Sequence, residues 1–209
     1  MKMLVAIPCI DTVHTEFARS LLSLRPVCDT QFCFSSGSLV YDSRNNLAVS
    51  AIEGGFDRVL WLDSDMSLPP ELIRALSEDL DGGRACVGAM YSTRKPPFRP
   101  CVYRALYMAT EEDGKQRPVC ETVESWPEDE LFEAAGIGFG AVMMTTELLE
   151  KVRARFGLPF SPILGFGEDL SFCLRATQLG EKIWCDPRIR CGHIGLYTYS
   201  DKDWRPPNE

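Results

Sequence analysis

The N-terminal part of the chain alternates short apolar segments with segments of helical periodicity, and this alternation constrains the fold more than any other feature. It predicts strands over residues 4–10, 29–34 and 58–62 and helices over residues 15–24 and 43–53. A continuous apolar run such as residues 4–10 is typical of a parallel strand that is buried on both faces. Strand, helix, strand, helix, strand is the order of one half of an α/β sheet.

The alternation continues downstream, with strands predicted over residues 85–91 and 182–185 and a return to the core over residues 136–144. A helix start is predicted within residues 67–71, and helices are predicted over residues 147–156 and 168–179. Residues 95–133 differ from the rest, because they are rich in proline and charge, and we expect a small, less regular layer there. The chain has 209 residues, 45% of them hydrophobic, and shows no internal repeat and no linker. One domain over residues 1–209 is therefore predicted.

Charge and cysteine content narrow the range of partners and compartments. The formal net charge of -8 argues against broad nucleic-acid binding, although Arg94, Lys95 and Arg99 form a local basic cluster that either faces a phosphate or is a solvated loop. The nine cysteines are scattered, odd in number and without a Cys-x-x-Cys pair, which favours a reducing cytoplasm. No apolar run approaches the roughly 20 residues that span a bilayer.

Asp63 and Asp65 follow directly after the predicted strand over residues 58–62. If strand geometry persists through Ser64, the period of two puts both carboxylates on the same side of the chain. Ligands of open α/β sheets bind beyond the carboxyl ends of the strands, and paired carboxylates suit Mg²⁺ or Mn²⁺, which in turn bind phosphate. A polar turn at a strand end has the same composition, so the triplet alone leaves both interpretations open.

A second acidic pair, Glu168 and Asp169, begins a predicted helix after Gly167. The positive end of a helix dipole keeps a carboxylate ionised, and an ionised carboxylate can accept the proton of an attacking hydroxyl. Helix capping is the alternative, and spacing alone favours it. His193 follows the last predicted strand, in Gly192-His193-Ile194-Gly195. A lone histidine is more often structural than a ligand, but as a ligand imidazole suits Mn²⁺ better than Mg²⁺.

Several of these segments together resemble one family. Trp61-Leu62-Asp63-Ser64-Asp65-Met66 resembles the nucleotide-sugar-binding motif of GT-A glycosyltransferases, especially the family-2-like enzymes. The resemblance extends to the basic helix start over residues 43–48, the glycine-containing segment 136–140 and the Glu-Asp segment 167–175. His193 stands where several GT-A enzymes have a third metal ligand. The motifs occur in the expected order over most of the chain, and residues 95–133 match least.

The resemblance implies a GT-A fold, which is a Rossmann-like α/β/α sandwich of three layers with a mixed, mainly parallel central sheet. It divides the chain into a nucleotide-binding half (1–92), an acceptor-binding half (93–195) and a C-terminal tail or lid (196–209).

The resemblance also implies roles for individual residues. The metal, Mn²⁺ or Mg²⁺, would be bound by Asp63, Asp65 and His193, and Asp169 would be the base with Glu168 beside it. The nucleotide-sugar would be contacted by Pro8, Cys9, Asp11, Arg44, Asp63, Ser64, Asp65 and Gly138, and the acceptor by Glu168 and Arg94.

The implied function is the metal-dependent transfer of a sugar, as by a hexosyltransferase, from a nucleotide-sugar donor (a UDP-sugar) to a hydroxyl acceptor. A polysaccharide precursor and a hydroxymethylated base of phage DNA are both among the acceptors that this format allows. A nucleotidyltransferase also uses paired carboxylates, but residues 7–11 lack its Gly-rich phosphate loop. A dinucleotide-dependent oxidoreductase is disfavoured for a similar reason. A non-catalytic nucleotide-sugar-binding module stays open.

Overall fold

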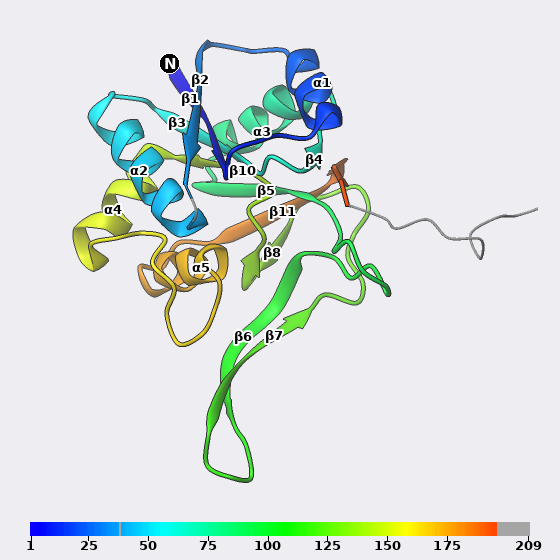
Figure 1. The fold of residues 1–209 in the computed structure, drawn as a ribbon, viewed down its shortest axis with the longest axis vertical. Helices are drawn as coiled ribbons and strands as arrows, with labels where there is room; N and C mark the ends of the chain where they lie inside the picture. The colour runs from blue at the N-terminus through cyan, green and yellow to red at the C-terminus, as the bar shows by residue number, and fades with distance from the viewer. Residues whose placement is uncertain (38, 196–209) are drawn as a thin grey trace, which may run out of the picture.

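A computed structural model describes residues 1–37 and 39–195, and its centre is a seven-stranded sheet (Figure 1). The spatial order is β2-β1-β3-β10-β5-β11-β8, and β10 and β8 run opposite to the other strands. The predicted mixed, mainly parallel sheet is thus confirmed. Its strands are β1 (Lys2–Cys9), β2 (Asp29–Ser36), β3 (Arg58–Leu62), β5 (Cys86–Met90), β8 (Phe132–Ala134), β10 (Ala141–Thr145) and β11 (Ile183–Arg190).

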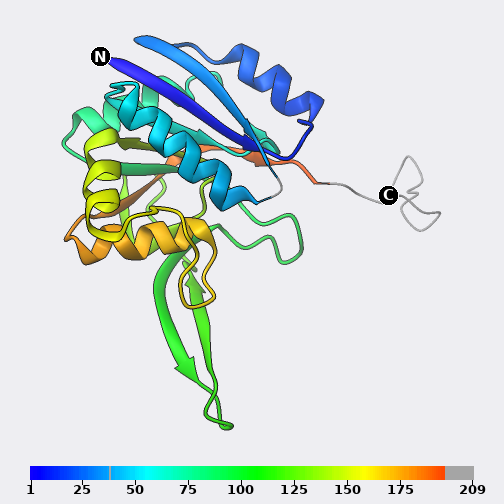
Figure 2. The same ribbon diagram turned by 60° about the vertical axis from the view of Figure 1, so that its left-hand side comes forward.

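Helices cover both faces of the sheet, so the predicted three-layer arrangement is confirmed (Figure 2). One face packs against α1 (Thr15–Ser23) and α3 (Leu72–Asp81). The other packs against α2 (Val40–Glu53), α4 (Thr146–Phe156) and α5 (Glu168–Gln178). Both faces are apolar because side chains alternate along each buried strand.

Strand β1 illustrates this arrangement. Leu4 and Ala6 join the core cluster under α2 and α4, whereas Met3, Val5 and Ile7 join the cluster under α1 and α3. All five side chains are nearly or fully buried. A strand with two buried faces needs a continuous apolar sequence, which is why residues 4–10 could be recognised.

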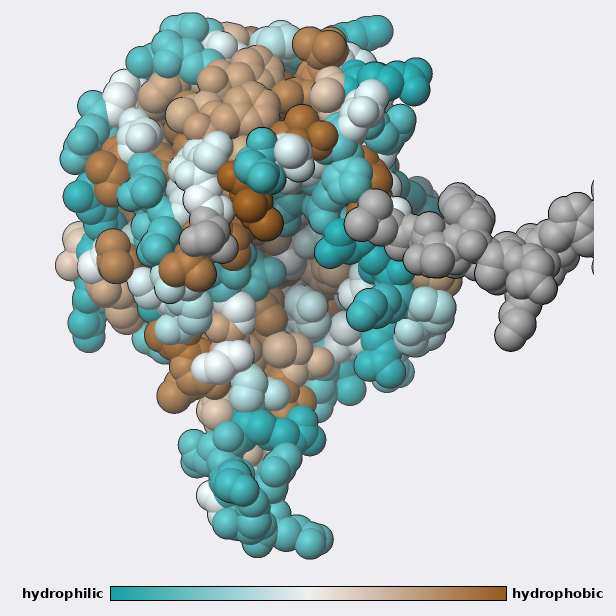
Figure 3. Space-filling model, in the orientation of Figure 1, coloured by the Kyte–Doolittle hydropathy of each residue, from teal (hydrophilic) through white to brown (hydrophobic). Residues whose placement is uncertain are grey.

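Two small sheets complete the fold. In one, β4 (Met66–Ser67) pairs with β12 (Gly192–His193), and in the other β6 (Val102–Thr110) lies between β7 (Gln116–Thr122) and β9 (Gly136–Ile137). The β6–β7 ribbon projects from the body in both ribbon views, and its far end is hydrophilic (Figures 1 to 3). The expectation of short, less regular pieces over residues 95–133 was therefore wrong for this ribbon. A ribbon that stands in solvent buries neither face fully, so its sequence lacks a clean period of two.

Three further expectations concern the cysteines, membrane-spanning segments and the C-terminal residues. All nine cysteines are unpaired. Within the described residues, no helix is both long and apolar enough to cross a bilayer. The predicted tail or lid over residues 196–209 lies outside the described residues.

Candidate active site

The Asp63-Ser64-Asp65 triplet forms a turn at the end of β3, because the strand stops at Leu62 and the Met66 N–H donates to the Asp63 carbonyl at 3.3 Å. Strand geometry does not persist through Ser64, so the two carboxylates point to different partners. Asp63 contacts Arg44, whereas Asp65 contacts His193 and Arg94. We call Arg44, Asp63 and Glu168 the inner half of the site and Asp65, His193 and Arg94 the outer half.

Arg44 joins the acidic groups of the inner half. Its Nη2 donates to Asp63 Oδ1 at 2.6 Å and its Nε donates to Glu168 Oε1 at 3.2 Å. The residue is only 1% exposed. Burial by itself lowers the pKa of Arg44, but the charges of Asp63 and Glu168 raise it above its ordinary value. Burial also raises the pKa of Asp63, and the charge of Arg44 opposes this shift. A fixed positive charge therefore holds two carboxylates from different halves of the chain.

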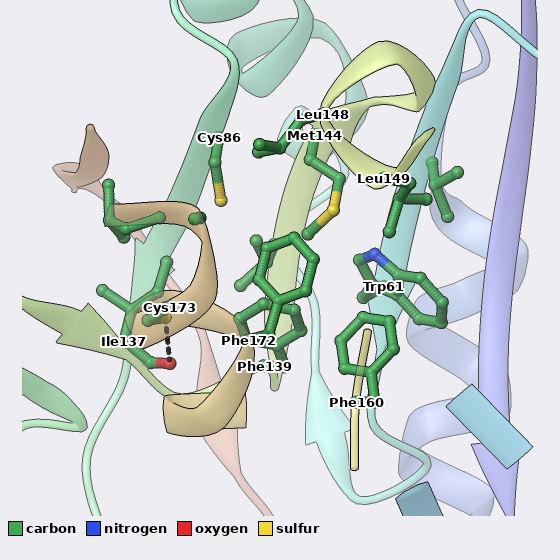
Figure 4. Close-up of a cluster of buried hydrophobic side chains, with 14 of the residues drawn as sticks. Trp61, Cys86, Ile137, Phe139, Met144, Leu148, Leu149, Phe160, Phe172 and Cys173 are labelled. Atoms are coloured by element: carbon green, nitrogen blue, oxygen red, sulfur yellow. Dashed lines mark hydrogen bonds between the residues drawn. The ribbon is translucent and has the colours of Figure 1, made fainter. Parts of the chain in front are cut away.

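Three aromatic rings, which we call the aromatic floor, lie against the guanidinium of Arg44. The group lies 5.4 Å from the ring centre of Phe139, 5.7 Å from that of Trp61 and 6.0 Å from that of Phe160. These rings and Phe172 pack against one another in the core under α2, α4 and α5 (Figure 4). Aromatic faces attract a guanidinium, and this attraction offsets part of the cost of burying the charge.

The outer half is built by the pairing of β4 with β12. Met66 pairs with His193 in this small sheet, and the Ile194 N–H donates to the Asp65 carbonyl at 2.7 Å. These contacts place His193 Nε2 3.4 Å from Asp65 Oδ2. The other ring nitrogen, Nδ1, lies 2.8 Å from the carbonyl oxygen of Ser92. Because a carbonyl can only accept, Nδ1 carries the hydrogen, and in the neutral ring the Nε2 lone pair faces Asp65.

Arg94 approaches the same carboxylate from the loop after β5. Its Nη1 donates to Asp65 Oδ2 at 2.8 Å, and its side chain is about half exposed. Burial would raise the pKa of Asp65, but the contacts with His193 and Arg94 bring it below its ordinary value. The contact with Asp65 raises the pKa of His193. Asp65 is therefore ionised, and it faces the guanidinium of Arg94 and, when the ring is protonated, the imidazolium of His193.

Glu168 and Asp169 occupy the first turn of α5, as predicted, with Gly167 at the N-cap. Asp169 Oδ1 accepts from the Leu170 N–H at 2.7 Å. Burial, followed by the negative charge of Glu168, raises the pKa of Asp169 to about 6. The expected effect of the helix dipole is thus outweighed by desolvation. A carboxylate with this pKa is mostly ionised at neutral pH and can still take up a proton.

A cleft of about 580 Å³ opens beside these groups. Its lining includes seven residues predicted from the sequence, namely Pro8, Cys9, Asp11, Asp63, Ser64, Asp65 and Glu168. It also includes five that were not predicted, namely Ile10, Thr12, His14, Gly37 and Val40. His14 is the N-cap of α1 and lines the cleft as well. The signal that could have found these residues is their place beyond the carboxyl ends of β1 and β2, in the segments that lead into α1 and α2.

Five of the predicted site residues are not part of the lining of this cleft, namely Arg44, Arg94, Gly138, Asp169 and His193. Arg44 is behind the carboxylates, in the inner half. Gly138 packs under Tyr91, since a Cβ at this position would come within 2.1 Å of Tyr91 Oη. The absence of a side chain at Gly138 thus makes room for a buried tyrosine rather than for a nucleotide.

Comparison with solved structures shows what this architecture is similar to. A197 from STIV superposes with a TM-score of 0.65 at 18% identity, covering 94% of this chain and 87% of that chain. GalNAc-T7, in a structure with UDP, GalNAc and Mn²⁺, superposes with a TM-score of 0.57 at 12% identity, covering 93% of this chain and 44% of that chain. The chain has a GT-A-like fold. No protein-family model and no curated protein matches the sequence. At such identities the likeness shows the fold alone.

The donor atoms of the outer half suit a divalent cation. Asp65 and His193 offer one carboxylate and one imidazole lone pair side by side. Within residues 1–37 and 39–195, no group of three histidine, cysteine, aspartate or glutamate side chains converges on one point. The expected third ligand, Asp63, instead pairs with Arg44. Two protein ligands are enough for Mg²⁺-like ions, which keep several waters and bind substrate phosphate.

Proposed function

We propose that this protein is a metal-dependent glycosyltransferase that moves a sugar from a nucleotide-sugar donor, a UDP-sugar, to a hydroxyl acceptor. The observation that carries the proposal is the Asp65–His193 contact of 3.4 Å, with the histidine tautomer fixed by Ser92, at a cleft of about 580 Å³. The cleft volume lies in the range of small-molecule sites. The GT-A-like fold and the UDP and Mn²⁺ of the GalNAc-T7 structure support the same assignment.

In this proposal Asp65 and His193 hold Mn²⁺ or Mg²⁺. When bound, the ion supplies Lewis-acid stabilisation of the leaving nucleoside diphosphate. Pro8, Cys9 and Asp11 form the wall for the nucleoside end of the donor, together with Ser64. Arg44 becomes a positioning residue rather than a nucleotide contact, because it fixes Asp63 and Glu168 from behind.

Asp169 is the proposed base. As the acceptor oxygen forms its bond to the anomeric carbon, the bond from that carbon to the diphosphate breaks, and the hydroxyl proton passes to Asp169. A pKa of about 6 leaves the carboxylate ionised at neutral pH and basic enough to accept the proton. Glu168 lines the cleft beside Asp169 and is the proposed contact to the sugars. The nine unpaired cysteines fit the reducing cytoplasm as the place of action.

The test combines ligand binding with turnover. UDP at about 100 times its Kd, with Mn²⁺, should stabilise the protein by about 2.7 kcal/mol, which for a chain of this size is a rise in Tm of roughly 5–10 °C. A screen of UDP- and GDP-sugars for Mn²⁺-dependent hydrolysis should then identify the donor. The Asp65→Asn variant should lose both responses. Asp113→Asn, at an exposed position paired with Lys115, is the matched control and should keep both.

Other outcomes would exclude the proposal. Stabilisation by NAD but not by UDP with Mn²⁺ would contradict it, and so would full donor hydrolysis by Asp65→Asn. Release of pyrophosphate from a nucleoside triphosphate would indicate a nucleotidyltransferase instead. Binding of UDP-sugars with no hydrolysis and no transfer to any acceptor would indicate a binding module.

A further inference from the structure

The loop between β5 and β6 is a closed structure that is attached to the outer half of the site. The Thr93 N–H donates to the Arg99 carbonyl at 2.8 Å, and the Phe98 N–H donates to the Lys95 carbonyl at 2.9 Å. At its base, the Ser92 carbonyl accepts from His193 Nδ1 at 2.8 Å. The loop is thus preorganised, and its position is tied to the proposed metal ligand.

One side of this loop encloses a cationic hollow of about 510 Å³. Its lining residues include Arg94, Lys95, Arg99 and His193. Arg94 reaches Asp65, but no carboxylate in the described part of the chain lies within ion-pair distance of Lys95 or Arg99. Basic side chains that converge on a hollow in a protein of net charge -8 point to an anionic ligand. The sequence left two interpretations of these basic residues open, a phosphate contact and a solvated loop. The hollow favours the phosphate contact.

The other side of the loop borders an aromatic hollow of about 440 Å³, whose lining includes Tyr91, Phe98 and Trp126. The two hollows share Thr93 and His193. Phe98 is 58% exposed and has a φ of 54°, in the left-handed region. A large apolar residue in this conformation costs about 1–2 kcal/mol, and such outliers cluster at ligand-binding positions.

Resting on the function proposed above, we propose that the two hollows are the acceptor subsite and that the acceptor is a phosphorylated sugar. Its phosphate binds Lys95, Arg99 and Arg94, and its ring lies against Phe98 and Trp126. Charged hydrogen bonds from lysine and arginine suit a phosphate, and an aromatic wall suits the apolar face of a ring. Because His193 borders both hollows, an acceptor held there would lie next to a residue proposed to hold the metal.

The surroundings favour a small ligand over a nucleic acid. Glu124, Glu128, Asp129 and Glu130 are exposed on the segment that carries Trp126. A polyanion that extends past the two hollows would meet these carboxylates, and nucleic-acid binding needs several phosphate contacts. A single phosphorylated sugar needs only the three cations of the loop.

The experiment measures binding by calorimetry, with Mn²⁺ present, to wild type and two double variants. Lys95→Gln with Arg99→Gln removes two charges from the hollow. Lys115→Gln with Arg117→Gln removes two charges at the end of the β6–β7 ribbon and is the matched control. The probes are glucose 1-phosphate, glucose, oligothymidylate and UDP. We expect the Kd for glucose 1-phosphate to rise about tenfold or more in the first variant and less than about twofold in the control. The Kd for UDP should not change.

The remaining outcomes separate the alternatives. An unchanged Kd for glucose 1-phosphate overturns the inference, as does a loss of UDP affinity alone, which would assign the cations to the donor diphosphate. Oligothymidylate that binds more tightly than glucose 1-phosphate and is lost in the first variant would replace the sugar by a nucleic acid. Failure of wild type to bind UDP with Mn²⁺ would contradict the proposed function itself, whatever glucose 1-phosphate does.

Discussion

The two ends of one three-residue turn differ in what holds them. In the inner half, Asp63 pairs with an arginine that is 1% exposed and rests on aromatic rings. In the outer half, Asp65 pairs with an arginine whose side chain is about half exposed. The guanidinium of Arg44 is closed to water, although Asp63 and Glu168 keep part of their surface in water, whereas the contact of the half-exposed Arg94 can be exchanged for that of a ligand. The contacts of Asp63 therefore contribute mainly to the stability of the fold, whereas Asp65 is available to bind a ligand.

The largest expected effect concerns the aromatic floor of the inner half. Phe160 is fully buried and packs against Trp61 and Phe172, so Phe160→Ala should cost about 4 kcal/mol in the free energy of unfolding. Phe98, which is 58% exposed beside the outer half, provides the matched substitution. Phe98→Ala should change stability by less than about 0.5 kcal/mol. Urea unfolding measures both values, and equal losses would mean that the halves do not differ in packing.

The second prediction compares the two arginines. Arg44→Met should cost about 3 kcal/mol, the lower end of the range for breaking a buried ion pair, because Asp63 and Glu168 keep part of their surface in water. Arg94→Met should cost less than about 1 kcal/mol, since a half-exposed pair is screened by solvent. The same urea unfolding experiment measures both variants. A larger loss for Arg94→Met would reverse the assignment of the stabilising half.

The sequence predicted the order of elements well because buried strands are continuous apolar runs and each helix has a visible start or stop. It failed at Asp186-Pro187-Arg188, which has the composition of a turn and lies inside β11. There Asp186 pairs with Ala89 of β5 and Arg188 reaches Asp79 of α3 at 3.1 Å, so tertiary pairing supports a strand that local composition opposes.

The residues predicted for the site lie close together in the structure, but their pairing could not be predicted from the sequence. Position after β3 was enough to place Asp63 and Asp65 at the cleft, whereas Glu168 begins a helix and was found through the family resemblance, and His193 lines the two neighbouring hollows. The burial of Arg44 could not be predicted, because its aromatic surroundings come from segments far apart in the chain and its sequence neighbours, Ser43 and Asn45, are polar. The divergence of the two aspartates likewise depends on a turn whose partners lie on distant elements.

The smallest expected effect is on pH dependence, and it tests whether dry surroundings set the chemistry next to the inner half. Burial raises the pKa of Asp169 to about 6, and the base works only when ionised. At saturating Mn²⁺, kcat/KM should thus be constant above about pH 7 and fall tenfold per pH unit below about pH 6.

Asp169→Asn should lack this limb, and Arg94→Met should keep it at the same pH, because the charge of Arg94 is not among the causes of the shift. In Arg44→Met the limb should move to higher pH, since the positive charge that favours the ionised carboxylate is lost. A limb near pH 4 in wild type would mean that Asp169 is hydrated, and the contrast between the buried Arg44 and the half-exposed Arg94 would then not extend to the proposed base.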